Sequence, residues 1–149
     1  MLEKIQADLN QALKDRDEIK VSTLRLLIGA VRNYAIAKES TSYTPSDEEI
    51  ISVIQSQAKQ RRDSIEQFKA GGRTELVEKE TKELAILQSY LPEQLSGDEV
   101  KVLVEQKLKE LGTTSVADMG KVMGVLSSEL KGKADMGLVS AIVRKKLAG

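Results

Sequence analysis

Apolar residues recur along this chain every three or four positions, and polar residues fill the positions between them. One such stripe comprises Leu2, Ile5, Leu9, Ala12 and Leu13, and the next comprises Leu24, Leu27, Ile28, Val31 and Ala35. This spacing places the apolar side chains on one face of an α-helix. No segment alternates apolar and polar residues for long enough to require a strand, so the pattern predicts an all-α fold.

Turn and capping residues divide the pattern into seven expected helices. The first helix is expected at about 2–14, and the second from after a turn at 15–17 to about 38, followed by a loop at 39–45. The third is expected from the Ser46 cap to a stop at Gly71-Gly72, and the fourth at about 74–90. Two capping boxes, Ser46 with Glu49 and Ser96 with Glu99, mark where the third and fifth helices begin. The fifth helix is expected to end at Gly112. Two shorter helices then occupy the rest of the chain.

A helix stop at Pro92 followed closely by the Ser96 capping box marks the expected domain boundary. We therefore predict an N-terminal four-helix part, residues 1–92, followed by a small three-helix C-terminal unit, residues 96–149. Ser115 and Asp118 are the predicted caps at the start of its last helical pair.

Glycines give this last helical pair, residues 118–147, its expected geometry. Gly120 and Gly124 lie one turn apart, and each costs about 1 kcal/mol of helix propensity relative to alanine. That cost predicts a helix face that another backbone approaches closely. Gly132 is a natural left-handed stop for the first helix, and Asp135 is a natural N-cap for the second.

The chain as a whole is electrically balanced, with 23 basic and 23 acidic residues, but its C-terminal part is not. Residues 96–149 carry 9 basic and 7 acidic side chains and no aromatic residue. The positive side chains of the last helical pair include Lys121, Lys131, Lys133, Arg144 and Lys145. We expect these five to form one positive surface around the start of the last helix, where free N–H groups and the helix dipole also attract phosphate. The alternative is that Gly132 only closes a helical hairpin and the lysines stay solvated.

The absence of both Cys and His excludes a thiolate nucleophile, an imidazole base and the usual zinc ligands. Gly132-Lys133 does not form a phosphate-binding loop, because a helix precedes it and Ala134 stands where Ser or Thr is required. We expect no metal, no cofactor and no catalytic activity of the protein alone. The lack of Cys favours a reducing cytosol. No apolar run approaches the ~20 residues that span a bilayer, so no membrane contact is expected.

Charged side chains of the N-terminal part have simpler expected roles. The run Glu75, Glu78, Glu80 and Glu83 is expected to form a solvated helix face. Arg61 is expected to form ion pairs. Arg25 and Arg32 lie seven residues apart, and we expect their aliphatic stems to serve helix packing.

Several runs of residues together resemble the YqeY-like family over essentially the whole chain. They are Ser22-Thr23-Leu24-Arg25-Leu26-Leu27, Lys59-Gln60-Arg61-Arg62-Asp63-Ser64-Ile65 and Tyr90-Leu91-Pro92-Glu93-Gln94-Leu95. The segments Met119–Gly124 and Gly132–Asp135 are similar to the tail domain of the B subunit of the glutamine-dependent tRNA amidotransferase. The resemblance implies an all-helical fold. It also implies a role in holding tRNA, because that tail contacts tRNA while the chemistry lies in domains that this sequence lacks.

Three functions remain open from the sequence. The first is binding of tRNA or another structured RNA through the C-terminal unit. The second is an accessory role, or a place as a subunit, in a glutamine-dependent amidotransferase. The third is a protein adaptor whose helical grooves receive a partner helix.

Overall fold

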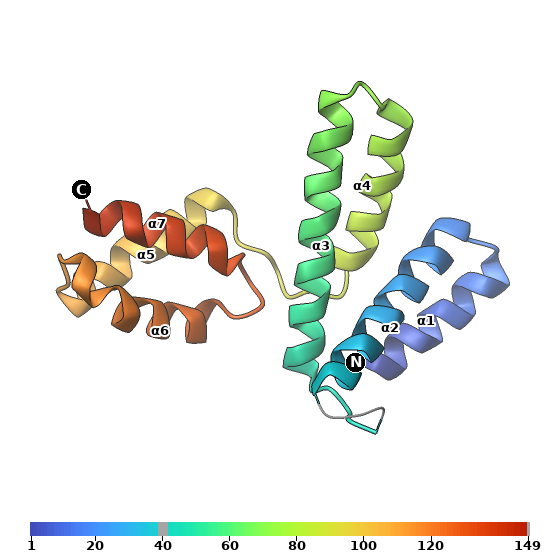
Figure 1. The fold of residues 1–149 in the computed structure, drawn as a ribbon, viewed down its shortest axis with the longest axis horizontal. Coiled ribbons are helices and arrows are strands. Elements are labelled where there is room, and N and C mark those ends of the chain that lie inside the picture. The colour runs from blue at the N-terminus through green and yellow to red at the C-terminus, as the bar shows by residue number, and fades with distance from the viewer. Residues whose placement is uncertain (39–41, 149) are drawn as a thin grey trace. The chain divides into compact units, whose positions relative to one another are not determined.

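The computed structural model describes residues 1–38 and 42–148. These residues form seven α-helices, one short 3₁₀ helix and no strand (Figure 1), which confirms the all-α prediction. Residues 39–41 of the predicted loop and Gly149 of the predicted C-terminal unit lie outside the described residues. The chain separates into two compact units, Met1–Leu91 and Pro92–Gly149, and each is described by itself.

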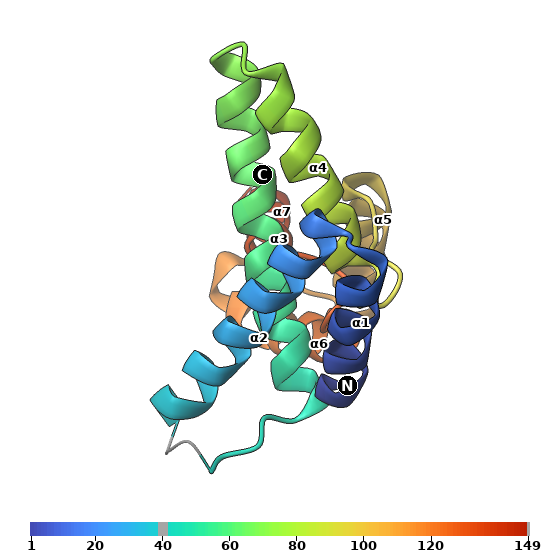
Figure 2. The ribbon, with the colours of Figure 1, turned by 90° about the vertical axis from the view of Figure 1, so that its right-hand side faces the viewer.

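Two helical hairpins build the first unit. Helix α1 (Leu2–Asp15) pairs with α2 (Glu18–Lys38), and α3 (Asp47–Ala70) pairs with α4 (Thr74–Gln88). Helix α2 packs against both α3 and α4 and thereby joins the two hairpins (Figure 2). The buried side chains at this junction are Ile5, Leu24, Leu27, Ile28, Val31, Ile50, Ile54 and Leu87. They come from the apolar stripes that predicted the helices.

Tyrosine hydroxyls donate to carboxylates where elements of the first unit meet. Tyr34 of α2 donates to Glu49 of α3 at 2.6 Å, and Tyr43 donates to the same carboxylate at 2.7 Å. The bonds from Tyr34 and Tyr43 lower the pKa of Glu49 to about 2. Glu49 also accepts from the N–H of Ser46 and so completes the predicted capping box. Tyr90, after α4, donates to Asp8 of α1 at 2.5 Å.

A buried carboxylate lies between α3 and α4, where the sequence predicted a solvated face. Glu83 is 5% exposed, and its Oε2 lies 3.3 Å from Nη1 of Arg61. The same Arg61 nitrogen lies 3.0 Å from Glu80. The solvated-face interpretation is therefore wrong for these two glutamates, because the tight packing of α4 on α3 turns them inward. Burial raises the pKa of Glu83, the neighbouring Glu80 charge raises it further, and Arg61 opposes both effects.

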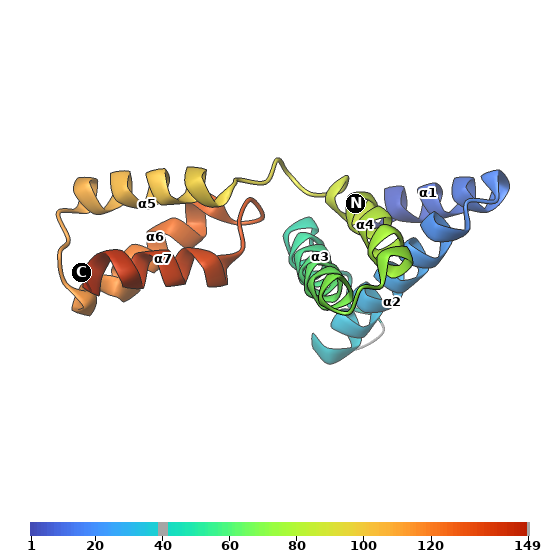
Figure 3. The same cartoon turned by 90° about the horizontal axis from the view of Figure 1, so that it is seen from above.

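Three helices and a short 3₁₀ turn form the second unit (Figure 3). They are α5 (Gly97–Leu111), the 3₁₀ helix η1 (Val116–Asp118), α6 (Met119–Leu130) and α7 (Met136–Ala148). Their core comprises Val100, Val104, Val122, Leu126, Leu130, Ala134, Val139, Ile142, Val143 and Leu147. Ser115 caps η1 by accepting from the N–H of Ala117. The side chain of Asp118 makes no capping bond, because η1 leads directly into α6.

Candidate nucleic-acid interface

A five-residue turn, Lys131–Asp135, joins α6 to α7 and is fixed from within its own unit. Gly132 adopts a left-handed conformation with a φ of 78°. The N–H of Lys133 donates to the carbonyl of Leu130 at 2.9 Å. Ala134 is only 4% exposed and belongs to the core of the unit. Ala134 therefore anchors the turn in the core, while Lys131 and Lys133 remain exposed on either side of Gly132.

The segment before α5 holds the other side of this turn. The N–H of Leu95 donates to the carbonyl of Lys133 at 2.9 Å. The amide of Gln94 donates to the carbonyl of Gly132 at 2.6 Å and to that of Pro92 at 2.8 Å. The periodicity of apolar residues did not predict these hydrogen bonds, because Gln94 and Leu95 lie between helices. Their only sequence signal was their place in the Tyr90–Leu95 run.

Asp135 caps α7. Its Oδ1 accepts from the N–H of Gly137 at 2.9 Å, and its carbonyl accepts from the N–H of Val139. The Asp135 carboxylate thus accepts from an N–H group that was expected to be free to bind a phosphate. It also places a negative charge at the positive end of the helix dipole. The positive charge at this turn is therefore supplied by the lysine side chains, whereas the helix N-terminus is capped by a carboxylate.

The structure separates the five predicted cations into two groups. Lys131 and Lys133 lie in the turn, whereas Lys121 lies in the first turn of α6, ten residues away. At 1.5 Å per residue, that separation is about 15 Å along the helix. Because α7 returns along α6, Arg144 and Lys145 near its end lie at the far end of the hairpin from the turn (Figure 1). The prediction of one positive surface around the start of α7 is therefore wrong.

Two ion pairs join α5 to the α6–α7 hairpin. Lys107 lies 2.7 Å from Glu129 of α6 and 3.1 Å from Glu110. The bonds to Glu129 and Glu110 raise the pKa of Lys107. Lys146 of α7 pairs with Glu105. In contrast, Lys121, Lys133, Arg144 and Lys145 form no ion pair with any described residue.

Gly120 and Gly124 do not lie at a close helix crossing. Both are exposed, and a Cβ atom added at either would meet no atom within 4 Å. The prediction of close packing at these glycines is wrong for this unit. The reason is the register of α6, whose fully buried face carries Val122, Leu126 and Leu130.

Neither a metal centre nor a membrane span stands out in the described part of the chain. Residues 1–38 and 42–148 contain no group of three or more Asp and Glu side chains placed to hold a metal ion. Among the same residues, no helix combines the length and apolar character needed to cross a bilayer.

Three curated relatives that are similar to this chain come from fungi. A protein of Pyrenophora tritici-repentis is 32% identical over 149 residues, which are 99% of this chain and 78% of the relative. One of Vanderwaltozyma polyspora is 29% identical over 95% of this chain and 79% of its own length. One of Saccharomyces cerevisiae is 31% identical over 72% of this chain and 56% of its own length. Each is named "Altered inheritance of mitochondria protein 41, mitochondrial".

These names point to mitochondria and contradict the cytosolic location predicted from the sequence. The prediction is wrong because the absence of Cys limits disulfide chemistry but does not specify a compartment. The family profile described as Yqey-like protein matches residues 2–147. The chain therefore belongs to the YqeY-like family.

Proposed function

We propose that the C-terminal unit binds the phosphate backbone of a folded RNA such as tRNA. The observation that carries the proposal is the fixed turn with Lys131 and Lys133 exposed on it. Gln94, Leu95 and the buried Ala134 hold its backbone in place. Binding therefore requires little ordering of the main chain, which lowers the entropic cost of association.

A second contact lies at the other end of the same hairpin, with Lys121, Arg144 and Lys145. The two groups are about 15 Å apart along the helices. One phosphate cannot reach both groups, but the backbone of a folded RNA can. Together they neutralise an estimated ~3 to 5 phosphates, which makes the affinity strongly dependent on salt.

The C-terminal unit contains no aromatic residue, which limits the class of RNA that we propose as its ligand. Sequence-specific binding of single strands relies on bases stacked on aromatic side chains. A lysine surface without aromatic residues instead contacts phosphates and follows backbone shape. We therefore propose a folded RNA, and the resemblance to the amidotransferase tail makes tRNA the first choice. That resemblance also supports the alternative of association with amidotransferase subunits.

The test compares charge reversals in the full chain. One variant carries Lys131→Glu and Lys133→Glu, and a second carries Lys121→Glu, Arg144→Glu and Lys145→Glu. The matched control carries Lys101→Glu and Lys109→Glu on the exposed surface of α5 in the same unit. Fluorescence anisotropy with labelled, unfractionated tRNA gives the affinity at several salt concentrations. Circular dichroism confirms that each variant retains its helical content.

We expect the turn variant to bind tRNA at least about tenfold more weakly, with a salt slope reduced by roughly 2. The control should stay within about twofold of the wild type. Equal weakening by the control, or a wild-type affinity that does not change with salt, contradicts the RNA proposal. Co-purification of amidotransferase subunits with all three variants would instead support the alternative.

A further inference from the structure

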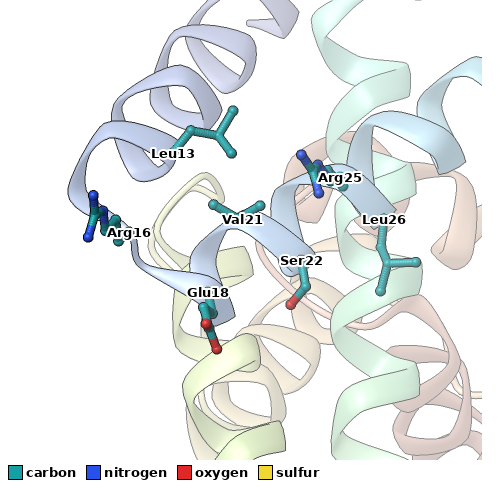
Figure 4. A pocket seen from close by; sticks show the side chains of 7 residues that line it. All are labelled: Leu13, Arg16, Glu18, Val21, Ser22, Arg25 and Leu26. Atoms are coloured by element: carbon teal, nitrogen blue, oxygen red, sulfur yellow. The ribbon is translucent and has the colours of Figure 1, made fainter.

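A shallow groove runs along the α1–α2 hairpin of the first unit. At the end near the α1–α2 turn it opens into a hollow of about 580 Å³. Figure 4 shows Leu13 of α1 and Val21 of α2 pointing into the same space between the helices, with Arg25 beside them. Leu13 is 45% exposed and Leu26, on the rim, is 57% exposed. This end of the groove is apolar apart from its charged edge.

Two further hollows continue along the same hairpin. The middle one, about 360 Å³, is lined by Gln6, Asn10, Gly29 and both Arg25 and Arg32. The third, about 380 Å³, lies beyond Arg32 and is lined by apolar residues that include Leu2 and Ile36. Arg25 is shared by the first two hollows and Arg32 by the last two. The three hollows therefore form one groove with apolar ends and a positive centre.

Helical spacing explains why the groove is continuous. Its lining residues on α2 include Glu18, Ser22, Arg25, Gly29, Arg32 and Ile36, which recur at intervals of three and four. Such positions follow one another along a single helix face. From Glu18 to Ile36 that face is about 27 Å long at 1.5 Å per residue. A partner helix of about 18 residues has the same length.

The positive centre of the groove is exposed, and none of the described residues pairs with it. Arg25 and Arg32, whose aliphatic stems were expected to serve helix packing, are both exposed. Neither guanidinium forms an ion pair or a hydrogen bond with any described residue. At Gly29, between the two arginines, an added Cβ would meet no atom within 4 Å, so the surface of α2 at this point is not covered by other residues. The two guanidiniums are seven residues, or about 10 Å, apart along the helix.

We propose that this groove receives an amphipathic helix of a partner protein. Apolar side chains at the two ends of the partner helix occupy the hollows around Leu13 and Ile36. Two carboxylates about two turns apart, between those apolar ends, pair with Arg25 and Arg32. This arrangement follows the usual mode in which an amphipathic helix lays its apolar face into a groove, and the charges fix its register.

Charge complementarity favours this occupant over a second copy of the chain. In a two-fold symmetric dimer the same patch meets itself. The groove would then bring Arg25 and Arg32 against the arginines of the other copy, and such like-charge contacts are unfavourable. RNA fits less well, because a phosphate backbone would leave the exposed apolar side chains Leu13, Leu26 and Ile36 in contact with water.

The probe is a displayed library of 21-residue helical peptides with an apolar stripe and random charge at the polar positions. The full chain selects binders, and the selected sequences are compared with the input library. Two variants are then measured with the selected peptides. One carries Arg25→Glu and Arg32→Glu. The matched control carries Arg62→Glu and Lys69→Glu, which lie at the same seven-residue spacing on the exposed face of α3.

We expect the selected peptides to be enriched in acidic pairs seven residues apart. Their affinity should fall at least tenfold with the Arg25/Arg32 reversal and stay within twofold with the control. Changing the two acids of the peptide to lysine should restore binding to the reversed protein. Leu26→Ser should weaken binding several-fold without changing the melting temperature, since Leu26 is largely exposed.

Three outcomes would overturn the proposal. One is that no peptide is retained above the background. Another is that retained peptides show no acidic enrichment or bind the reversed protein equally well. The third is that the wild-type protein self-associates or binds tRNA and the reversed variant does not, which would assign the groove to a second copy or to RNA.

Discussion

At the scale of single residues, Arg61 is a charged side chain whose removal should cost substantial stability. It lies within 3.3 Å of both Glu80 and Glu83, and both carboxylates are largely shielded from water. A buried charge that loses its partner is strongly destabilising, whereas a well-packed neutral replacement for the charge is often tolerated. The arginine and the glutamates should therefore respond very differently to substitution.

We predict that Arg61→Met lowers the free energy of unfolding by about 3 kcal/mol, because it leaves two shielded carboxylates unpaired. Glu83→Gln should change the free energy by less than about 1 kcal/mol, because Gln still accepts a hydrogen bond from Arg61. Arg62→Met, on the exposed face of the same helix, is the control and should stay within about 0.5 kcal/mol. Urea unfolding followed by circular dichroism measures all three. A loss with Glu83→Gln as large as that with Arg61→Met would contradict this account.

The raised pKa of Glu83 also sets the sign of a pH effect. The folded protein holds the Glu83 proton more tightly than the unfolded chain, whose glutamates titrate near 4.5. The contribution of Glu83 to stability therefore falls as the pH rises from about 4.5 through its raised pKa. Glu83→Gln removes this contribution, so its stability profile should be flatter than that of the wild type in that window. The same unfolding experiment, repeated from pH 4 to pH 7, measures the difference.

At the scale of elements, the bonds from Gln94 and Leu95 extend the second unit beyond the Ser96 capping box. Both residues bond to the turn between α6 and α7, and Leu95 also packs against the core. We predict that a fragment of residues 92–149 folds on its own and melts above a fragment of residues 96–149. Two hydrogen bonds and one partly buried leucine should contribute roughly 2 kcal/mol.

Circular dichroism melts of the two fragments provide the measurement. In the longer fragment, Gln94→Ala is a control that removes only the side-chain bonds and should lower its melting point by part of the difference. Equal melting points for the two fragments would mean that the segment before α5 does not hold the turn in solution.

The helices could be predicted because their apolar residues recur at helical spacing. The contacts made by the segments between helices could not be predicted, because that pattern stops there. The stripe from Leu24 to Ala35 gave α2, and the Ser46 capping box gave the start of α3, because both depend only on neighbours in the sequence. The bond from Leu95 to Lys133 joins residues 38 positions apart, so no local pattern could indicate it. The two cation groups were merged because charge along a sequence does not show that α7 runs back along α6. Close packing at Gly120 was wrongly predicted, because helix propensity shows that a glycine is costly in a helix but not what the glycine faces.

At the scale of the whole molecule, the sequence lacks the thiol and the imidazole that many amide-hydrolysing sites use. It has no Cys and no His, and no described carboxylates gather at a metal site. We predict that the purified protein releases no ammonia from glutamine and does not transform misacylated tRNA above the buffer rate. An enzymatic ammonia assay provides the measurement. Ammonia release above the buffer rate that persists through further purification of the protein would overturn the prediction.

The two candidate surfaces belong to different units, with the groove in Met1–Leu91 and the lysine turn in Pro92–Gly149. Substitutions at sites without shared partners usually have additive effects. The charge reversals proposed for the groove and for the turn can therefore be combined in one chain. Each reversal measured alone shows which ligand its surface binds, and the combined variant shows whether the two effects add.

The uneven distribution of aromatic residues gives each unit its own optical signal. Tyr34, Tyr43 and Tyr90 all lie in the first unit, and the chain contains no tryptophan. Intrinsic tyrosine fluorescence therefore reports only on the first unit, whereas far-ultraviolet circular dichroism reports on the helices of both. If the two units unfold as one, the two signals change at the same temperature. If they unfold separately, the difference between the two curves is the melting profile of the C-terminal unit, obtained without cutting the chain or attaching a label.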